Sequence, residues 1–220
     1  MKTITIIDYG SGNLRSAAKA FEHVVQKSPG AKVIVTNNPA DLEKATHIVL
    51  PGVGAFGDCA AGLAKIPGMV AALEKQVLQN KKPFLGICVG MQLLADIGHE
   101  YGEHKGLGWI KGEVRRINPS DKSLPIPHMG WNGLAAQKKL PLLNNIKSDV
   151  YFVHSYQFIC ANNDNLVATC DYGGQITAVI AKGNIMGVQF HPEKSQTAGL
   201  TLIENFLKVG DNNDEYAKRV

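Results

Sequence analysis

Apolar and polar positions in the first half of the chain alternate between two patterns. Short, fully apolar or β-branched runs predict strands at Thr3–Asp8, Lys32–Thr36, His47–Leu50 and Phe84–Ile87. Helical spacing predicts helices at Leu14–Gln26, Asp41–Ala45, Cys59–Asn80 with a break at Pro67–Gly68, and Val89–Ile97. Because fully apolar strands separated by helices need cover on both faces, the pattern indicates an α/β fold with a central, mostly parallel sheet between helices.

Beyond Gly106 the pattern changes to period-two alternation, which predicts a β-rich second half. The expected strands are Gly112–Ile117, Asp149–Ile159, Leu166–Asp171, Gln175–Ala181 and Asn184–Phe190. A last helix is expected at Thr197–Val209, followed by a frayed tail over residues 210–220. Since no composition break is long enough for a linker, we expect one domain over residues 1–209, whose β-rich half extends the same sheet or packs beside it.

Composition and charge argue against nucleic acid and membranes as binding partners. Charged residues make up 19% of the 220 residues, below the roughly 25% of typical soluble domains. The formal charge is +4 and basic residues occur only as scattered pairs, whereas nucleic-acid binding favours a dense basic stripe. The longest apolar stretch, Phe84–Ala95, is too short for a membrane span, and the run before Asp8 is too short for a signal peptide. We therefore expect a cytoplasmic protein that binds neither nucleic acid nor membranes, with free thiols.

The loop after the third predicted strand is rich in glycine. Gly52–Gly57 matches G-x-G-x-x-G, the phosphate-binding pattern of dinucleotide folds. That function also needs an acidic residue at the end of the next strand, where this chain has Cys88. Two interpretations stay open: the glycines only permit a tight turn, or the loop turns backbone N–H groups toward a developing anion.

Cys88 stands between the fourth strand and a helix, in the run Gly86–Gly90. Small residues on both sides allow the sharp turn that exposes a central nucleophile, and a helix N-terminus favours thiolate over thiol. A lone cysteine in an apolar run is usually an inert core residue, but the flanking glycines favour the nucleophile. The other three cysteines lack this context and are expected to be structural: Cys59, Cys160 and Cys170.

His191 and Glu193 follow directly after the last predicted strand. In extended backbone, residues two apart project to the same side, and Pro192 is expected to keep the segment from becoming helical. A carboxylate against one imidazole nitrogen leaves the other nitrogen free to act as a base. Alone, His-Pro-Glu is most often a surface turn; together with an elbow cysteine at the end of a strand, the catalytic interpretation is favoured.

The remaining histidines indicate no metal site. In His99–His104 the two histidines are five positions apart, whereas a helical H-E-x-x-H motif needs four, so we expect a surface loop. His154 is expected to be a core histidine. No spacing suggests a function for His23, His47 or His128. We expect neither a metal nor a cofactor.

The glycine loop, the cysteine elbow and His-Pro-Glu, in this order and at these separations, resemble the class I glutamine amidotransferases over essentially the whole chain. Four runs resemble, within that class, the glutaminase subunits of imidazole glycerol phosphate synthase: Asp8–Asn13, Pro51–Phe56, His128–Asn132 and His191–Ser195. The resemblance implies a single-domain, flavodoxin-like fold and hydrolysis of glutamine to glutamate and ammonia. The alternatives are an anthranilate or carbamoyl phosphate synthase glutaminase, a cysteine peptidase, or an inactive binding module on the same sheet.

The resemblance also implies roles for individual residues. Cys88 is the expected nucleophile, His191 the acid and base, and Glu193 the residue that orients His191. Backbone N–H groups of Val53 and Val89 are expected to hold the oxyanion. The residues expected to contact glutamine are Gly54, Gln92, Ser155 and Tyr156. The residues expected at an interface, near the mouth of an ammonia tunnel to a (β/α)₈-barrel cyclase subunit, are Asn13, Trp131, Tyr151 and Lys194.

Overall fold

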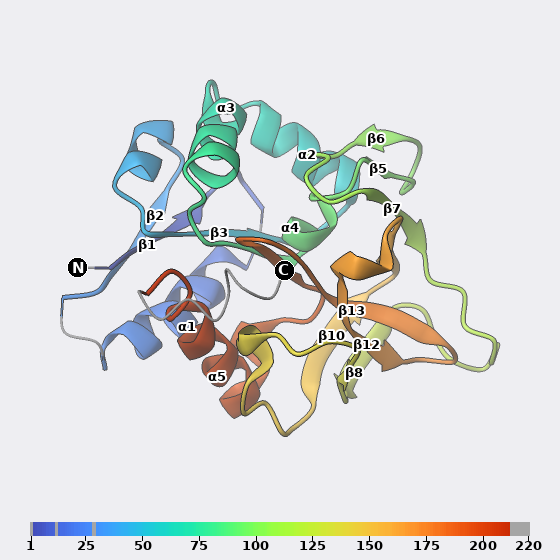
Figure 1. Cartoon of the computed structure of the whole chain (residues 1–220). Helices are drawn as coiled ribbons and strands as arrows, with labels where there is room; N and C mark the ends of the chain where they lie inside the picture. The colour runs from blue at the N-terminus through green and yellow to red at the C-terminus, as the bar shows by residue number, and fades with distance from the viewer. Residues whose placement is uncertain (1, 12, 28–29, 212–220) are drawn as a thin grey trace.

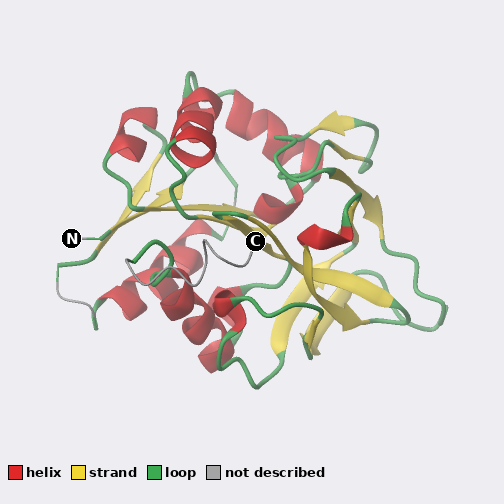
Figure 2. Cartoon of the chain, viewed as in Figure 1, coloured by secondary structure: helices red, strands yellow, loops and turns green. Residues whose placement is uncertain are grey.

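A computed structural model describes residues 2–11, 13–27 and 30–211. Its centre is a sheet with helices on both faces (Figures 1 and 2), in the strand order β2-β1-β3-β4-β14-β13-β12-β9. The strands from β2 to β14 are parallel and the rest are antiparallel. Their bounds are β1 Thr3–Ile7, β2 Lys32–Thr36, β3 His47–Gly52, β4 Phe84–Cys88, β9 Ala135–Ala136, β12 Leu166–Asp171, β13 Gln175–Lys182 and β14 Ile185–Val188. The predicted α/β fold with a mostly parallel sheet is confirmed.

Helices cover this sheet on both sides (Figure 1). Helix α1 (Leu14–Val25) packs beside α5 (Gln196–Phe206) on one face, where Phe21 meets Phe206 edge to face with ring centroids 6.4 Å apart. On the other face lie α2 (Phe56–Ala64) and α3 (Met69–Leu73), which a π-helical turn, Glu74–Gln79, extends. The predicted break at Pro67–Gly68 separates α2 from α3.

The double cover explains the sequence pattern of the central strands. Every residue of β1, β3, β4 and β14 is buried, which explains why these strands are built almost entirely of apolar or β-branched residues. Strand β2 lies at the edge of the sheet and is largely half-buried or exposed.

The β-rich half both extends this sheet and forms two smaller ones. Strand β10 (Val150–His154) pairs with β8 (His128–Asn132). Strand β11 (Tyr156–Cys160) pairs with β7 (Gly112–Arg116). On its other side β7 pairs with β5 (Ile97–Gly98), which in turn pairs with β6 (His104–Lys105). The single strand expected at Asp149–Ile159 is therefore wrong. The chain leaves one sheet and enters another at Ser155, whose carbonyl oxygen accepts a hydrogen bond from the Ile117 N–H at 2.9 Å.

Two other predicted segments also differ. Helix α4 spans only Val89–Gln92, because the carbonyl oxygens of Leu93, Leu94 and Ala95 accept hydrogen bonds from the returning segment 107–110. The brief helix expected at Asp41–Ala45 is a 3₁₀ turn at Pro39–Glu43. Most of the predicted tail, residues 212–220, lies outside the described residues.

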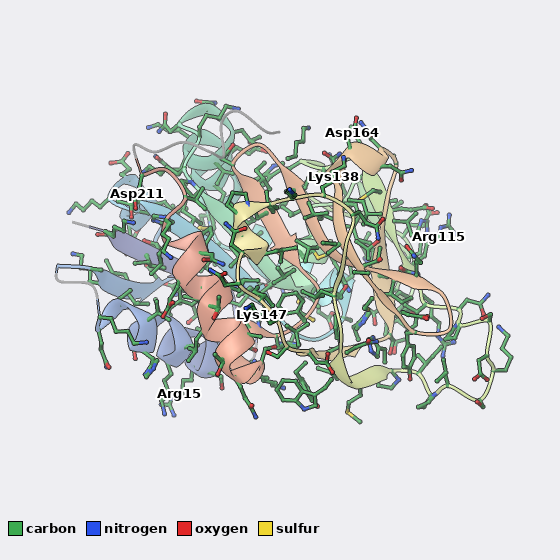
Figure 3. The ribbon with its side chains drawn as sticks, turned by 60° about the horizontal axis from the view of Figure 1, so that its bottom comes forward. Arg15, Arg115, Lys138, Lys147, Asp164 and Asp211 are labelled. Carbon is green, nitrogen blue, oxygen red and sulfur yellow. The ribbon has the colours of Figure 1, made fainter. Side chains whose placement is uncertain are left out.

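Charged side chains are spread around the outside of the molecule (Figure 3), where Arg15, Arg115 and Lys147 project at separate places. Lys138 pairs with Asp164 at 3.4 Å. Within the described residues, no single helix is long and apolar enough to cross a membrane; the sharply bent run from α2 through α3 passes that test only by length and composition.

Several histidines are buried by this fold, among them His47 at the start of β3. Its Nε2 donates to the carbonyl oxygen of Val209 at 3.1 Å, and its ring packs on Phe206. Burial, helped by the nearby Lys2, lowers the pKa of His47 to about 4. In an unfolded chain the pKa is about 6.5, so between these values the unfolded state binds a proton that the folded state does not. The free energy of unfolding contributed by His47 therefore falls as pH falls from about 6.5 to about 4.

The variant His47→Gln removes this titration while keeping an N–H donor. We expect the drop in unfolding free energy between pH 7 and pH 5, measured by urea denaturation, to be smaller than in the parent by about 1–2 kcal/mol. His23→Gln, on the exposed surface of α1, is the matched control and should keep the parental drop. A parental drop in His47→Gln would contradict the effect of burial.

Candidate active site

Three parallel strands end side by side and bring the predicted loops together. Gly52, the last residue of β3, stands opposite Cys88 at the end of β4, and β14 runs beside β4. A cavity of about 530 Å³ lies at this edge. Ten of the predicted site residues line it: Asn13, Val53, Gly54, Cys88, Val89, Gln92, Ser155, Tyr156, His191 and Lys194. Glu193 lies behind the lining and contacts His191. Tyr151 and Trp131 lie beside it, next to Lys194.

The backbone turns sharply at Cys88. Its φ is 53° and its ψ is −113°, a conformation that non-glycine residues rarely adopt, and α4 starts at the next residue. A Cβ atom on Gly90 would lie 1.8 Å from the carbonyl oxygen of Leu50, and one on Gly86 would lie 2.5 Å from that of Gly90. The glycines are therefore required because β3, β4 and α4 pack backbone against backbone. This is the geometry of a nucleophile elbow.

His191 and Glu193 meet as the sequence predicts, but from a different local structure. Residues Pro192–Lys194 form a 3₁₀ turn, with proline at its first position, where its missing N–H costs nothing. The expectation that Pro192 prevents a helical turn is therefore wrong. The Nδ1 of His191 lies 2.7 Å from Oε1 of Glu193, and both side chains are buried. The same Oε1 accepts a second hydrogen bond, from the side-chain amide of Asn13.

The electrostatics of His191 follow from these neighbours. Burial alone lowers the pKa of an imidazole, but Cys88 and Glu193 outweigh this effect and raise the pKa of His191. The raised pKa favours the imidazolium form of His191. Within the described residues, Nε2 of His191 is buried and makes no hydrogen bond. That nitrogen is therefore free to exchange a proton in the cavity.

Strand β10 anchors the loop that carries His191. The N–H of His191 donates to the carbonyl oxygen of Tyr151 at 2.9 Å. The hydroxyl of Ser195 donates to the carbonyl oxygen of His191 at 2.7 Å and accepts from the N–H of Tyr151 at 3.0 Å. Both main-chain polar groups of Tyr151 are thus used to hold this loop.

The glycine loop is held from behind, away from the cavity. The N–H of Val53 donates to Oγ of Ser11 at 2.7 Å, and the Ser11 hydroxyl lies 3.2 Å from the carbonyl oxygen of Val53. The phenol of Tyr9 donates to the carbonyl oxygen of Pro51 at 2.7 Å. Gly54 has φ +109°, and no atom lies within 4 Å of the place its Cβ would occupy. The Val53 N–H therefore faces Ser11 in this structure.

Four residues of the cavity wall are not among the predicted site residues: Glu100, Pro127, Val153 and His154. Glu100 accepts a hydrogen bond from the N–H of Phe56, at the start of α2, at 2.8 Å. His154 lines the cavity and contacts Nδ1 of His128 through its own Nε2 at 3.0 Å. Glu100 stands in a segment that the sequence suggested only as a surface loop. Among the described residues, no group of three His, Cys, Asp or Glu side chains is placed to hold a metal ion.

The predicted interface residues lie together beside the cavity. Trp131 and Tyr151 are paired across β8 and β10, with ring centroids 5.8 Å apart and nearly perpendicular planes. The ammonium group of Lys194 lies 5.6 Å above the Tyr151 ring. Trp131 is 47% exposed and Met129, on the same strand, is 64% exposed. This part of the surface, Met129, Trp131, Tyr151 and Lys194, is called the aromatic face below.

Comparison with known proteins agrees with this geometry. The family model described as glutamine amidotransferase class-I matches residues 5–209. A solved glutamine amidotransferase structure has a TM-score of 0.68 at 19% identity and covers 93% of this chain and 97% of its own. A second, from Thermotoga maritima, has a TM-score of 0.65 at 16% identity and covers 94% of this chain and 96% of its own. Both support the fold.

Curated relatives indicate which group within this family the chain belongs to. Imidazole glycerol phosphate synthase subunit HisH of Rhodospirillum rubrum is 54% identical over 93% of this chain and 98% of its own length. The subunit of the same name from Zymomonas mobilis is 52% identical over 93% and 95%. This protein therefore belongs to the class I glutamine amidotransferase family, within the group formed by the HisH subunits of imidazole glycerol phosphate synthase.

Proposed function

We propose that this chain hydrolyses glutamine to glutamate and ammonia through a thioester on Cys88, and passes the ammonia to a (β/α)₈-barrel cyclase subunit. The observation that carries the proposal is the strained turn at Cys88, which faces one cavity together with His191. A structural cysteine has no need of a strained, positive-φ backbone conformation at a strand end. The buried Glu193 carboxylate behind His191 completes a triad.

The proposed chemistry assigns one step to each side chain. The Cys88 thiolate attacks the side-chain amide carbon of glutamine and forms a tetrahedral oxyanion. His191 gives its proton to the nitrogen as the C–N bond breaks, so ammonia leaves and a thioester forms. His191 then takes a proton from water, which attacks the thioester, releases glutamate and restores Cys88. Glu193 and Asn13 keep the His191 ring in place throughout.

The oxyanion requires backbone donors at the turn. The N–H of Val89, the first residue of α4, is expected to supply one of them. The N–H of Val53 is the second expected donor, but in this structure it donates to Ser11. Removing one donor of this type costs on the order of 3 kcal/mol in the barrier. We infer that rotation of the Gly52–Val53 peptide away from Ser11 completes the hole and sets the rate.

The cavity walls suit a free amino acid. The Glu100 carboxylate, which lines the cavity and accepts from the Phe56 N–H, supplies a negative charge for the α-ammonium group of glutamine. Ser155 and Tyr156, where the chain passes from β10 to β11, supply further polar groups to the cavity wall.

The aromatic face is the proposed docking surface for the cyclase subunit. Exposed Trp131 and Met129 are the apolar side chains that a partner would cover. Because Lys194 belongs to this face and also lines the cavity, ammonia released at Cys88 has a route into the partner that avoids bulk water, where it would be protonated. We therefore expect weak turnover by the isolated chain and strong activation by the partner with its nucleotide ligand.

Iodoacetamide near pH 7 should modify Cys88 first among the four cysteines. Burial raises the pKa of the thiols of Cys160 and Cys170 to about 11 and about 12, and that of Cys59 also rises. Peptide mapping by mass spectrometry identifies the modified residue, and His191→Asn should slow the reaction by removing the imidazolium. First labelling of Cys59, Cys160 or Cys170 would contradict the assignment.

Cys88→Ala should abolish glutamine-dependent synthesis by the complete complex while its ammonia-dependent synthesis stays at the parental rate. The reason is that only the first reaction needs the thioester. Both rates are measured with added partner subunit, with Cys160→Ala as the matched control. Loss of both reactions in a complex that still assembles would argue against the role of Cys88.

Ser11→Ala should raise the glutaminase rate of the isolated chain by up to about tenfold, since it removes a hydrogen bond worth roughly 1 kcal/mol that holds Val53 away from the cavity. Glutamate release is the measurement. Ser16→Ala, on the exposed face of α1, is the control. A rate that stays unchanged or falls would show that the Ser11 contact does not restrain the loop.

A further inference from the structure

A buried side-chain amide lies between the nucleophile and the cavity wall. Gln189 follows β14, two residues before His191, and is fully buried. Its Nε2 donates to Sγ of Cys88 at 3.6 Å, and its Oε1 accepts from Nε2 of Gln92 at 3.0 Å. None of the catalytic steps above uses Gln189.

The amide of Gln92 uses both of its N–H groups inside the protein. Its Nε2 donates to Oε1 of Gln189 and also to the carbonyl oxygen of Tyr156, at 3.1 Å. A carboxamide has two N–H donors on nitrogen and one acceptor oxygen. With both donors used, the oxygen is the polar atom that Gln92 can offer to the cavity it lines.

One carbonyl oxygen decides the orientation of both amides. The carbonyl of Tyr156 can only accept, so Gln92 must turn its nitrogen toward it. Gln189 must then present its oxygen to Gln92, which leaves its own nitrogen for the sulfur of Cys88. A thiolate also only accepts hydrogen bonds. The directions of the hydrogen bonds from Gln189 to Cys88 and from Gln92 to Tyr156 therefore agree with the acceptors at both ends.

The Tyr156 carbonyl is itself held by His154, which is in turn held by His128. Nδ1 of His154 donates to it at 2.8 Å, and Nε2 of His154 accepts from Nδ1 of His128 at 3.0 Å. Burial lowers the pKa of both histidines to about 4. Each ring is therefore neutral near pH 7, with one donor and one acceptor nitrogen, as this arrangement requires.

We propose that Gln189 is a positioning residue, which fixes the amide of Gln92 with its carbonyl oxygen toward the substrate and steadies the Cys88 thiolate with its own N–H. An acceptor at this place selects a ligand group that donates hydrogen bonds, such as the ammonium or amide hydrogens of glutamine, over a carboxylate. The inference rests on the proposed function, since it takes glutamine as the ligand of the cavity.

A double-mutant cycle in the complete complex tests it. Gln92→Leu removes the substrate-facing oxygen, and Gln189→Met removes the group that orients it while filling similar space. We expect each change to raise KM for glutamine by roughly tenfold or more, with a smaller effect on kcat. Because Gln189 acts on KM through Gln92, the double variant should show the KM of Gln92→Leu alone. Multiplied KM effects, or a parental KM in Gln189→Met, would overturn the proposal.

A second readout separates positioning from general damage to the fold. In the isolated chain, Gln189→Met should slow alkylation of Cys88 by iodoacetamide about threefold or more, whereas Gln92→Leu, which does not touch the sulfur, should keep the parental rate. Equal slowing by both variants would contradict the specific contact. Gln79→Leu, at an exposed position, is the control, and ammonia-dependent synthesis reports assembly.

If Gln189→Met does not fold, Gln189→Glu takes its place. Its carboxyl oxygen still accepts from Gln92, so KM should stay within about threefold of the parent; a KM as high as that of Gln92→Leu would overturn the proposal. A parent complex that hydrolyses no glutamine would instead defeat the proposed function. If the unmodified complex hydrolyses glutamine and Gln189→Met has the same KM, only the role of Gln189 is contradicted.

Discussion

Where β4 ends, the backbone of α4 passes so close to β3 that a methyl group on Gly90 would lie 1.8 Å from the carbonyl oxygen of Leu50. The chain reaches this contact through a sharp turn at Cys88, whose φ is positive. The parallel register then sets the rest of the site, because β3 and β14 end on either side of β4. The glycine loop follows β3, and Gln189 and His191 follow β14, so both segments lie close to the sulfur atom of Cys88.

Strand β10 connects the proposed docking surface to this chemistry. The Tyr151 ring contacts Trp131 and Lys194 on the aromatic face, while its N–H and carbonyl groups hold the His191 loop through Ser195 and directly. Four residues further along the chain, Ser155 and Tyr156 form the cavity wall. A partner bound to the aromatic face would therefore contact the strand that positions both His191 and the cavity wall at Ser155 and Tyr156.

Features set by local chemistry could be predicted from the sequence. The glycines around Cys88 predicted the elbow. The contact between His191 and Glu193 was also predicted, although from extended backbone and not from the 3₁₀ turn that makes it. Features set by distant packing could not. The run Asp149–Ile159 shows one continuous alternation, and only the pairing of its halves with β8 and β7 divides it at Ser155. Similarly, Asn13 reaches Glu193 across 180 positions of sequence, and the amides of Gln92 and Gln189 are oriented by a main-chain carbonyl that carries no sequence signal.

The central claim is that the turn at the end of β4 makes Cys88 the covalent nucleophile. The most direct test is a rapid acid quench of the complete complex during glutamine turnover, followed by mass spectrometry of the denatured chain. A glutamyl thioester on Cys88, formed and lost at rates compatible with turnover, is the predicted result. Continued hydrolysis with no adduct, or an adduct on a different residue, would contradict it.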